Sequence, residues 1–225
     1  MTDWLVSLTP DSLSGLAFVS LVIASFFTSA VSAAIGIGGG IMLLALMANL
    51  MPASAIIPVH AMVQLGSTTG RVIALWRHVD WGIVLWFSVG GVVGAFFGGQ
   101  VAVNIPPQAL QVAIGAFILY STWMPIYKFS TSRRSMTLFG GGTSFLSMIV
   151  GGVAPFIFVV LKELFTDRRG LVSTLGAVLT LQAFLKALIF GLFGFMFAEW
   201  LWVIGLRFSV GLGLLLLARV VFAGV

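Results

Sequence analysis

Four polar side chains that can donate hydrogen bonds recur at helical spacing within one apolar stretch. His60, Gln64, Ser67 and Arg71 fall at i, i+4, i+7 and i+11, which places all four on one face of a helix. Thr68 lies beside this stripe. Guanidinium, amide and hydroxyl groups suit an anion, so we predict that Gln64, Ser67, Thr68 and Arg71 bind one, and we expect His60, nearer the opposite surface, to be structural. Arg71 alternatively extends toward the nearby membrane surface, and hydroxyl and amide groups alternatively join helices.

A second polar pair, Gln182 and Lys186, stands one helical turn apart in a later apolar stretch. At about 1.5 Å per residue, Lys186 lies roughly 25 Å from Arg169 and 15 Å from Met196, too deep to reach either membrane surface. Burial of a lysine at such depth costs about 2.5–3.5 kcal/mol. We therefore expect Lys186 to face the interior of a helix bundle, to have a partner there and to attract an anion.

Glycine is concentrated in two short apolar segments. The first holds Gly36, Gly38, Gly39 and Gly40, and the second begins with Gly151 and Gly152. Free N–H groups at a helix start attract anions, and irregular backbone is tolerated in lipid only when it is buried or lines a wet cavity. We predict two opposed anion-binding turns. Close packing between helices is the alternative, because small residues allow membrane helices to touch.

The remaining chemistry-bearing residues argue against an enzyme. Asp80, Glu163, Asp167 and Glu199 all stand at the ends of apolar segments, which leaves no deep carboxylate for a proton relay or a Na⁺ site. Two scattered histidines without cysteine make no metal-ligand set, and we expect no cofactor. Ser144 has no base at a suggestive spacing. An intramembrane hydrolase is therefore a weak alternative.

These residues require membrane helices to position them. The chain is 60% hydrophobic and 8% charged, against about 25% charged residues in soluble domains. Its apolar segments are 13–34, 36–51, 54–76, 81–103, 107–127, 136–152, 154–165, 171–197 and 199–222. We predict an all-α, polytopic transmembrane bundle. Segments 36–51 and 154–165 are shorter than the roughly 20 residues of a full span, so each is a tilted span, half of a broken helix or a re-entrant hairpin.

Basic residues orient this bundle. They cluster at Arg77 and His78, at Lys128 to Arg134, and at Arg168 and Arg169. With the N-terminus outside and every segment counted as one crossing, all three clusters fall in the cytoplasm. The net charge of +5 therefore indicates orientation in the cell inner membrane and not nucleic-acid binding. The lipid bilayer is the expected partner, and a homo-oligomer stays open.

The two glycine segments also suggest an internal repeat. When Gly38 and Gly39 are aligned with Gly151 and Gly152, Val59 aligns with Val172. Five crossings separate the units, so the halves would have inverted topology, a pattern that indicates a transporter site near the bilayer midplane. We predict an N-terminal half at 1–127, a basic cytoplasmic linker at 128–135, and a C-terminal half at 136–225 that is one span shorter.

Three stretches resemble the TauE/SafE family of sulfite-exporter-like membrane proteins: "AIGIGGGIMLLAL", "RHVDWGIVLWFSVGGVVGAFFGG" and "FLKALIFGLFGF". The resemblance runs from about Phe18 to Phe197. It implies a carrier with two related halves that exports sulfite or a small organosulfonate by alternating access, and it favours the anion-site interpretation of the first glycine segment. A non-transporting membrane scaffold and a transporter of another small anion are the alternatives.

Overall fold

The computed structural model describes residues 15–35, 38–122, 132–201 and 204–205, and all regular structure within them is helical. The α-helices are α2 (Gly15–Ile35), α3 (Gly39–Leu50), α4 (Ala53–Leu75), α5 (Trp81–Asn104), α6 (Pro107–Thr122), α7 (Arg133–Val150), α8 (Ala154–Lys162) and α9 (Arg168–Leu192). Two 3₁₀ turns, η1 (Trp76–His78) and η2 (Phe197–Trp200), accompany them. The prediction of an all-helical bundle is confirmed.

Short polar side chains define where several helices start. The carboxylate of Asp80 accepts hydrogen bonds from the N–H groups of Gly82 and Ile83 at 2.9 and 3.1 Å, at the start of α5. Asp167 accepts from the Gly170 N–H at 2.9 Å at the start of α9. Such caps satisfy N–H groups that the first helical turn leaves without an acceptor, so the helix boundaries follow from local sequence.

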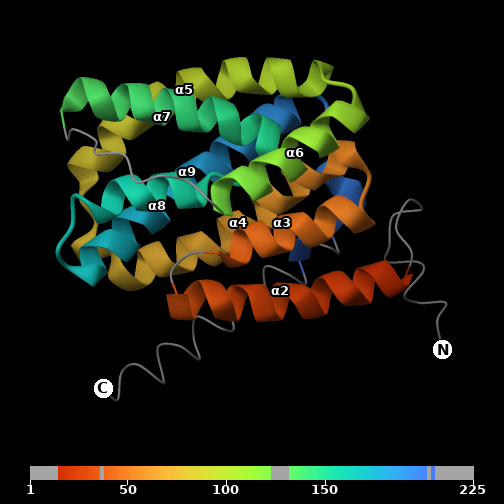
Figure 1. The fold of residues 1–225 in the computed structure, drawn as a ribbon, viewed down its shortest axis with the longest axis horizontal. Helices are drawn as coiled ribbons and strands as arrows, with labels where there is room; N and C mark the ends of the chain where they lie inside the picture. Colours follow the sequence, from red (N-terminus) through yellow and green to blue (C-terminus); the bar gives the residue numbers. More distant parts are fainter. Residues whose placement is uncertain (1–14, 36–37, 123–131, 202–203, 206–225) are drawn as a thin grey trace.

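The helices run along the long axis of the molecule; most of their connections lie at its two ends, whereas α3 and α8 begin near its middle (Figure 1). One end holds the α4–α5 connection, the start of α7 and the α8–α9 connection. The basic residues of these segments therefore share one end, as the predicted orientation requires. A hydrogen bond of 2.9 Å from the Asp80 N–H to Thr174 Oγ1 joins two of the segments.

The short segments are short helices. Among the described residues, α5 and α9 are long and apolar enough to cross a membrane. By contrast, α3 has 12 residues and α8 has 9, so at 1.5 Å per residue they span about 18 and 14 Å of a hydrocarbon core of about 30 Å. Both begin near the middle of the bundle and run toward opposite ends (Figure 1).

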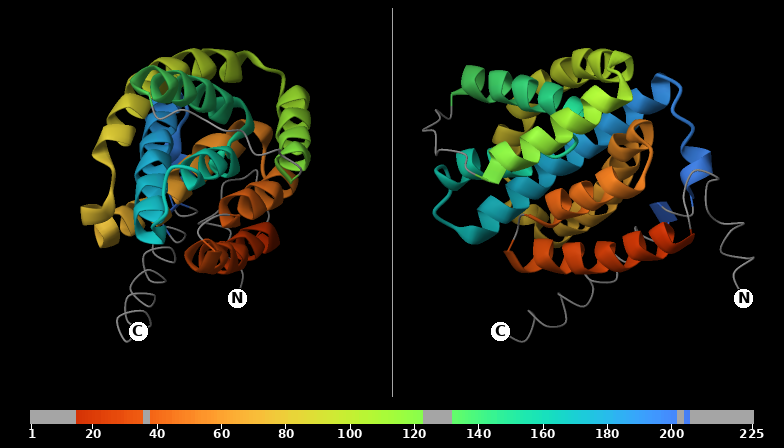
Figure 2. Two further views of the ribbon diagram at one scale, coloured as in Figure 1. Left: turned by 60° about the vertical axis from the view of Figure 1, so that its left-hand side comes forward. Right: turned by 45° about the vertical axis from the view of Figure 1, so that its right-hand side comes forward.

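Two helix pairs hold the bundle together. Along α5 and α7 a side chain on Gly90 would meet the Thr137 carbonyl, and one on Gly94 would meet the Gly141 carbonyl, so these helices touch backbone to backbone. They lie side by side across the bundle from α2 (Figure 2). The second pair, α4 and α9, is joined by a hydrogen bond of 2.9 Å from the Thr180 hydroxyl to the Thr68 hydroxyl.

Large apolar side chains cover the outside of these helices. Leu16, Leu119, Leu138 and Leu192 are each more than 70% exposed. Exposed apolar surface on this scale is expected where side chains contact lipid instead of water.

Candidate functional site

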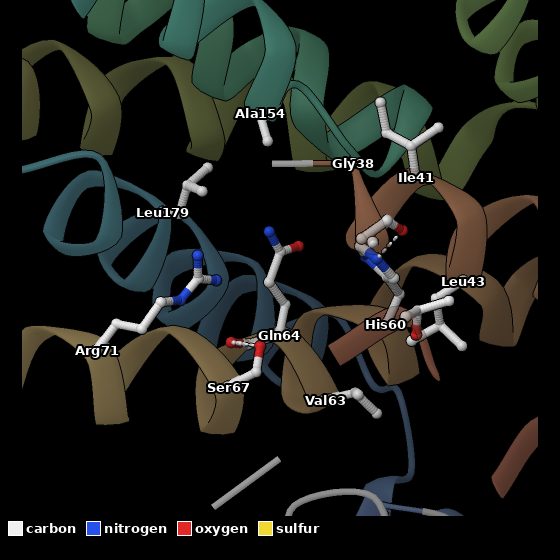
Figure 3. A pocket seen from close by; sticks show the side chains of 13 residues that line it. Gly38, Ile41, Leu43, His60, Val63, Gln64, Ser67, Arg71, Ala154 and Leu179 are labelled. Atoms are coloured by element: carbon white, nitrogen blue, oxygen red, sulfur yellow. Dashed lines mark hydrogen bonds between the residues drawn. The ribbon is translucent and has the colours of Figure 1, made fainter. Parts of the chain in front are cut away.

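A cavity of about 40 Å³ lies beside the start of α3, against α4 (Figure 3). Six predicted site residues line it: Gly38, Gly39, Gly40, Gln64, Ser67 and Arg71. The first glycine segment and the polar stripe, predicted as two separate features, are therefore parts of one site. Ala154 and Leu179 close it from the C-terminal half.

The glycine turn starts α3 at the edge of this cavity. Gly38 has φ 99° and ψ −43°, a conformation that side-chain-bearing residues rarely adopt. Its carbonyl accepts from the Ile41 and Met42 N–H groups, both at 3.1 Å. The N–H groups of Gly39 and Gly40 belong to the first turn, where no intrahelical acceptor exists for them. The turn thus offers N–H donors beside the cavity.

The polar stripe on α4 presents its side chains to the turn. His60 Nε2 lies 2.9 Å from the Gly40 carbonyl oxygen, and because a carbonyl only accepts, Nε2 carries a proton. The Gln64 amide points into the cavity between the Arg71 guanidinium and the His60 ring (Figure 3). Its Oε1 is buried and has no hydrogen-bond partner among the described residues. The Ser67 hydroxyl donates to the Gln64 backbone carbonyl at 3.2 Å.

The cavity is suited to a small anion. Its 40 Å³ is room for about three water molecules at roughly 10–15 Å³ each. A guanidinium group, an amide group and helix-start N–H groups can all donate to oxygen atoms placed there. Among the described residues, no three His, Asp or Glu side chains lie close enough to hold a metal ion.

Thr68 and the second glycine turn lie outside this cavity. Thr68 is buried and faces α9. Its hydroxyl donates to the Gln64 carbonyl of its own helix at 2.8 Å and accepts from the Thr180 hydroxyl of α9. Gly151, with φ 81°, ends α7. A side chain on Gly151 would meet Leu44 at 2.9 Å, and one on Gly152 would also contact Leu44. Gly36 lies outside the described residues.

Gln182 and Lys186 form a separate buried polar cluster. The Gln182 amide donates to Ser144 Oγ at 3.1 Å. The Lys186 ammonium donates to the Gly151 carbonyl at 2.6 Å, with the side chain only 3% exposed. The prediction that Lys186 faces the bundle interior and has a partner there is confirmed. That partner is a backbone carbonyl at the second glycine turn.

The structure adds two polar residues to the site that were not assigned to it. His60 belongs to the same helical stripe as Gln64 and Arg71, so its spacing already indicated that it faces the same side of α4. Thr28 of α2 also lines the cavity; Ser25, Thr28, Ser29 and Ser32 stand at i, i+3, i+4 and i+7, a helical spacing that could have indicated a polar face on α2.

Comparison with known proteins gives one result. The family model described as "Sulfite exporter TauE/SafE" matches residues 21–223, nearly the whole chain. Neither the curated proteins nor the solved structures contain a match. The matched region includes both glycine turns and both polar clusters.

Proposed function

The chain belongs to the sulfite exporter TauE/SafE family, and from this premise we propose that it exports a small sulfur-containing anion across the cell inner membrane. Membership makes the chain a membrane transporter and not an enzyme. Sulfite is the first candidate and a small organosulfonate the second. The N-terminus is proposed to lie outside, with the basic loops in the cytoplasm.

The observation that carries this proposal is the cavity at the Gly38 turn. It combines a backbone conformation that favours glycine, helix-start N–H groups and the Arg71 guanidinium around one cavity. Helix starts and arginine bind oxyanions for the same reason, because both direct N–H donors at a negative charge. A membrane scaffold has no need to bury such a set of donors.

The size of the cavity is consistent with sulfite, the first candidate. Room for about three water molecules matches a pyramidal oxyanion of four heavy atoms. An organosulfonate adds a carbon chain, which would have to extend beyond the cavity of about 40 Å³.

Alternating access between inverted halves at 1–127 and 136–225 is the proposed mechanism. Two observations support it. Gly38 and Gly151 have similar backbone angles, with φ 99° and ψ −43° against φ 81° and ψ −48°. The short helices that follow them run toward opposite ends of the bundle. In this proposal Lys186 holds the second turn through the Gly151 carbonyl, and contact of Lys186, Gln182 or that turn with the anion stays a prediction.

The test is sulfite efflux from proteoliposomes that contain the purified full chain. We expect saturable flux that Arg71→Gln abolishes. Arg77→Gln, at an exposed position in η1 just after the same helix, is the matched control and should transport normally. Lys186→Leu, run alongside, tests whether the second turn is needed.

The possible outcomes distinguish the proposed sulfite transporter from its alternatives. Equal loss in both arginine variants would remove Arg71 from the site. Competition by chloride or sulfate as strong as that by unlabelled sulfite would replace sulfite with another small anion. No flux from folded protein would refute transport of sulfite and favour a scaffold.

A further inference from the structure

We infer that the cavity binds its anion in the singly protonated, monovalent form, which for sulfite is hydrogen sulfite. The inference rests on the proposed function and concerns the same cavity. Two independent features lead to it: the charge available inside the cavity, and a buried acceptor atom that a fully deprotonated anion cannot satisfy.

The charge of the cavity matches one negative charge. Of the described residues that line it, Arg71 carries a permanent positive charge, His60 can titrate, and none is acidic. The parts of α2, α3, α8 and α9 that line the cavity contribute Thr28, glycine or apolar residues. The Lys186 ammonium donates elsewhere, to the Gly151 carbonyl. One guanidinium neutralises a monovalent anion, whereas a dianion leaves a net charge inside the bundle, where burial of charge is costly.

The Gln64 side chain supplies the second argument. Its Oε1 is buried and, within the described part of the chain, accepts no hydrogen bond. A carbonyl oxygen needs a donor, and a buried acceptor without one costs free energy. Sulfite as a dianion has only acceptor oxygens. Hydrogen sulfite has one hydroxyl, which can donate to Gln64 Oε1 while its other oxygens accept from Arg71 and the helix-start N–H groups.

Protonation of His60 is the competing explanation. Its Nε2–H already donates to the Gly40 carbonyl, so a second proton would go to Nδ1 and make the ring a cation. Together with Arg71, that cation would match a dianion. The two explanations therefore differ in which group controls the pH dependence, the anion or the protein.

Selenite separates them, because it has the same shape as sulfite and a higher second pKa. Initial rates of sulfite and selenite flux are measured in proteoliposomes across neutral pH, at fixed total anion well below saturation. We expect each rate to follow the singly protonated fraction and to fall about tenfold per pH unit above the second pKa of that anion. The midpoint for selenite should therefore lie at higher pH than the midpoint for sulfite.

Coincident midpoints would assign the titration to a protein group such as His60 and overturn the inference. A rate that rises with pH as the dianion forms would overturn it as well. In both cases the transporter proposal survives. Absence of saturable flux of both anions from folded protein would refute the proposed function and, with it, the inference. As a further check, the offset between the two midpoints should persist in His60→Gln, and its disappearance there would count against the inference.

Discussion

Gly40→Ala is the sharpest perturbation of the cavity that leaves the fold intact. A Cβ at this position would lie 3.7 Å from Gln64 Nε2 and 3.9 Å from His60 Nε2, which is ordinary van der Waals contact. Alanine also favours a helix over glycine by about 1 kcal/mol. The substitution should therefore leave folding unharmed while it places a methyl group against the space that we assign to the anion.

The size of the effect follows from the volume. A methyl group takes at least the room of one water molecule, about 10–15 Å³, from a cavity of 40 Å³. Forcing extra volume into a filled site typically costs about 1–3 kcal/mol. Because about 1.4 kcal/mol is a factor of ten in affinity, the KM for sulfite should rise roughly 5- to 150-fold.

The assay compares sulfite efflux and thermal unfolding in detergent for wild type, Gly40→Ala and Gly115→Ala. Gly115 is the matched control, since it lies within α6 and a Cβ there would meet nothing within 4 Å. Wild-type transport by Gly40→Ala would refute the reasoning, because the cavity would then not hold the anion. A lower Tm in Gly40→Ala alone would show instead that the position serves packing.

Three further predictions concern residues that stabilise the helices of the bundle. Gly94→Ala should cost about 1–3 kcal/mol of unfolding free energy, because its Cβ would meet the Gly141 carbonyl; equal Tm values for this variant and Gly142→Ala, whose Cβ meets nothing, would contradict this. Thr68→Val should lower stability by about 0.5–1.5 kcal/mol through loss of hydrogen bonds and leave the KM for sulfite unchanged, since Thr68 faces α9; a raised KM would return it to the anion site. N–H groups of Gly170 and Arg169 hold the pKa of Asp167 below its usual range, so this carboxylate stabilises the fold above about pH 3.9 and stops doing so as pH falls through the lowered pKa. Asp167→Ala should therefore have a lower Tm at neutral pH, with a difference from wild type that shrinks in acid, and a pH-independent difference would refute the role of charge.

The helices could be predicted from sequence because each one starts and ends at signals in the residues next to it. Apolar length, prolines and capping side chains determine where helices start and stop, and α5 begins at Trp81 and α6 at Pro107, where the apolar segments were expected to begin. The polar stripe on α4 was also predictable, since helical spacing determines which residues share a face.

Partners across helices could not be predicted in the same way. Depth along a helix indicated that Lys186 must be buried, but it does not show which neighbour its ammonium meets. That neighbour, the Gly151 carbonyl, lies 35 residues away in the chain. Thr68, beside the stripe, was also expected at the anion site, but its hydroxyl meets Thr180 of α9 and does not line the cavity. Such outcomes depend on how two helices cross, which periodicity within one helix does not determine.

The glycine contacts between α5 and α7 have a mechanical consequence. At Gly90 and Gly94 the main chains of the two helices touch, with no side chain between them to rotate or slide. A helix pair of this kind moves as one stiff body. Because α5 precedes the basic linker and α7 follows it, the body combines parts of both sequence halves. The two halves are then expected to move relative to each other around the cavity, at α3, α4, α8 and α9, while the contact between α5 and α7 stays fixed.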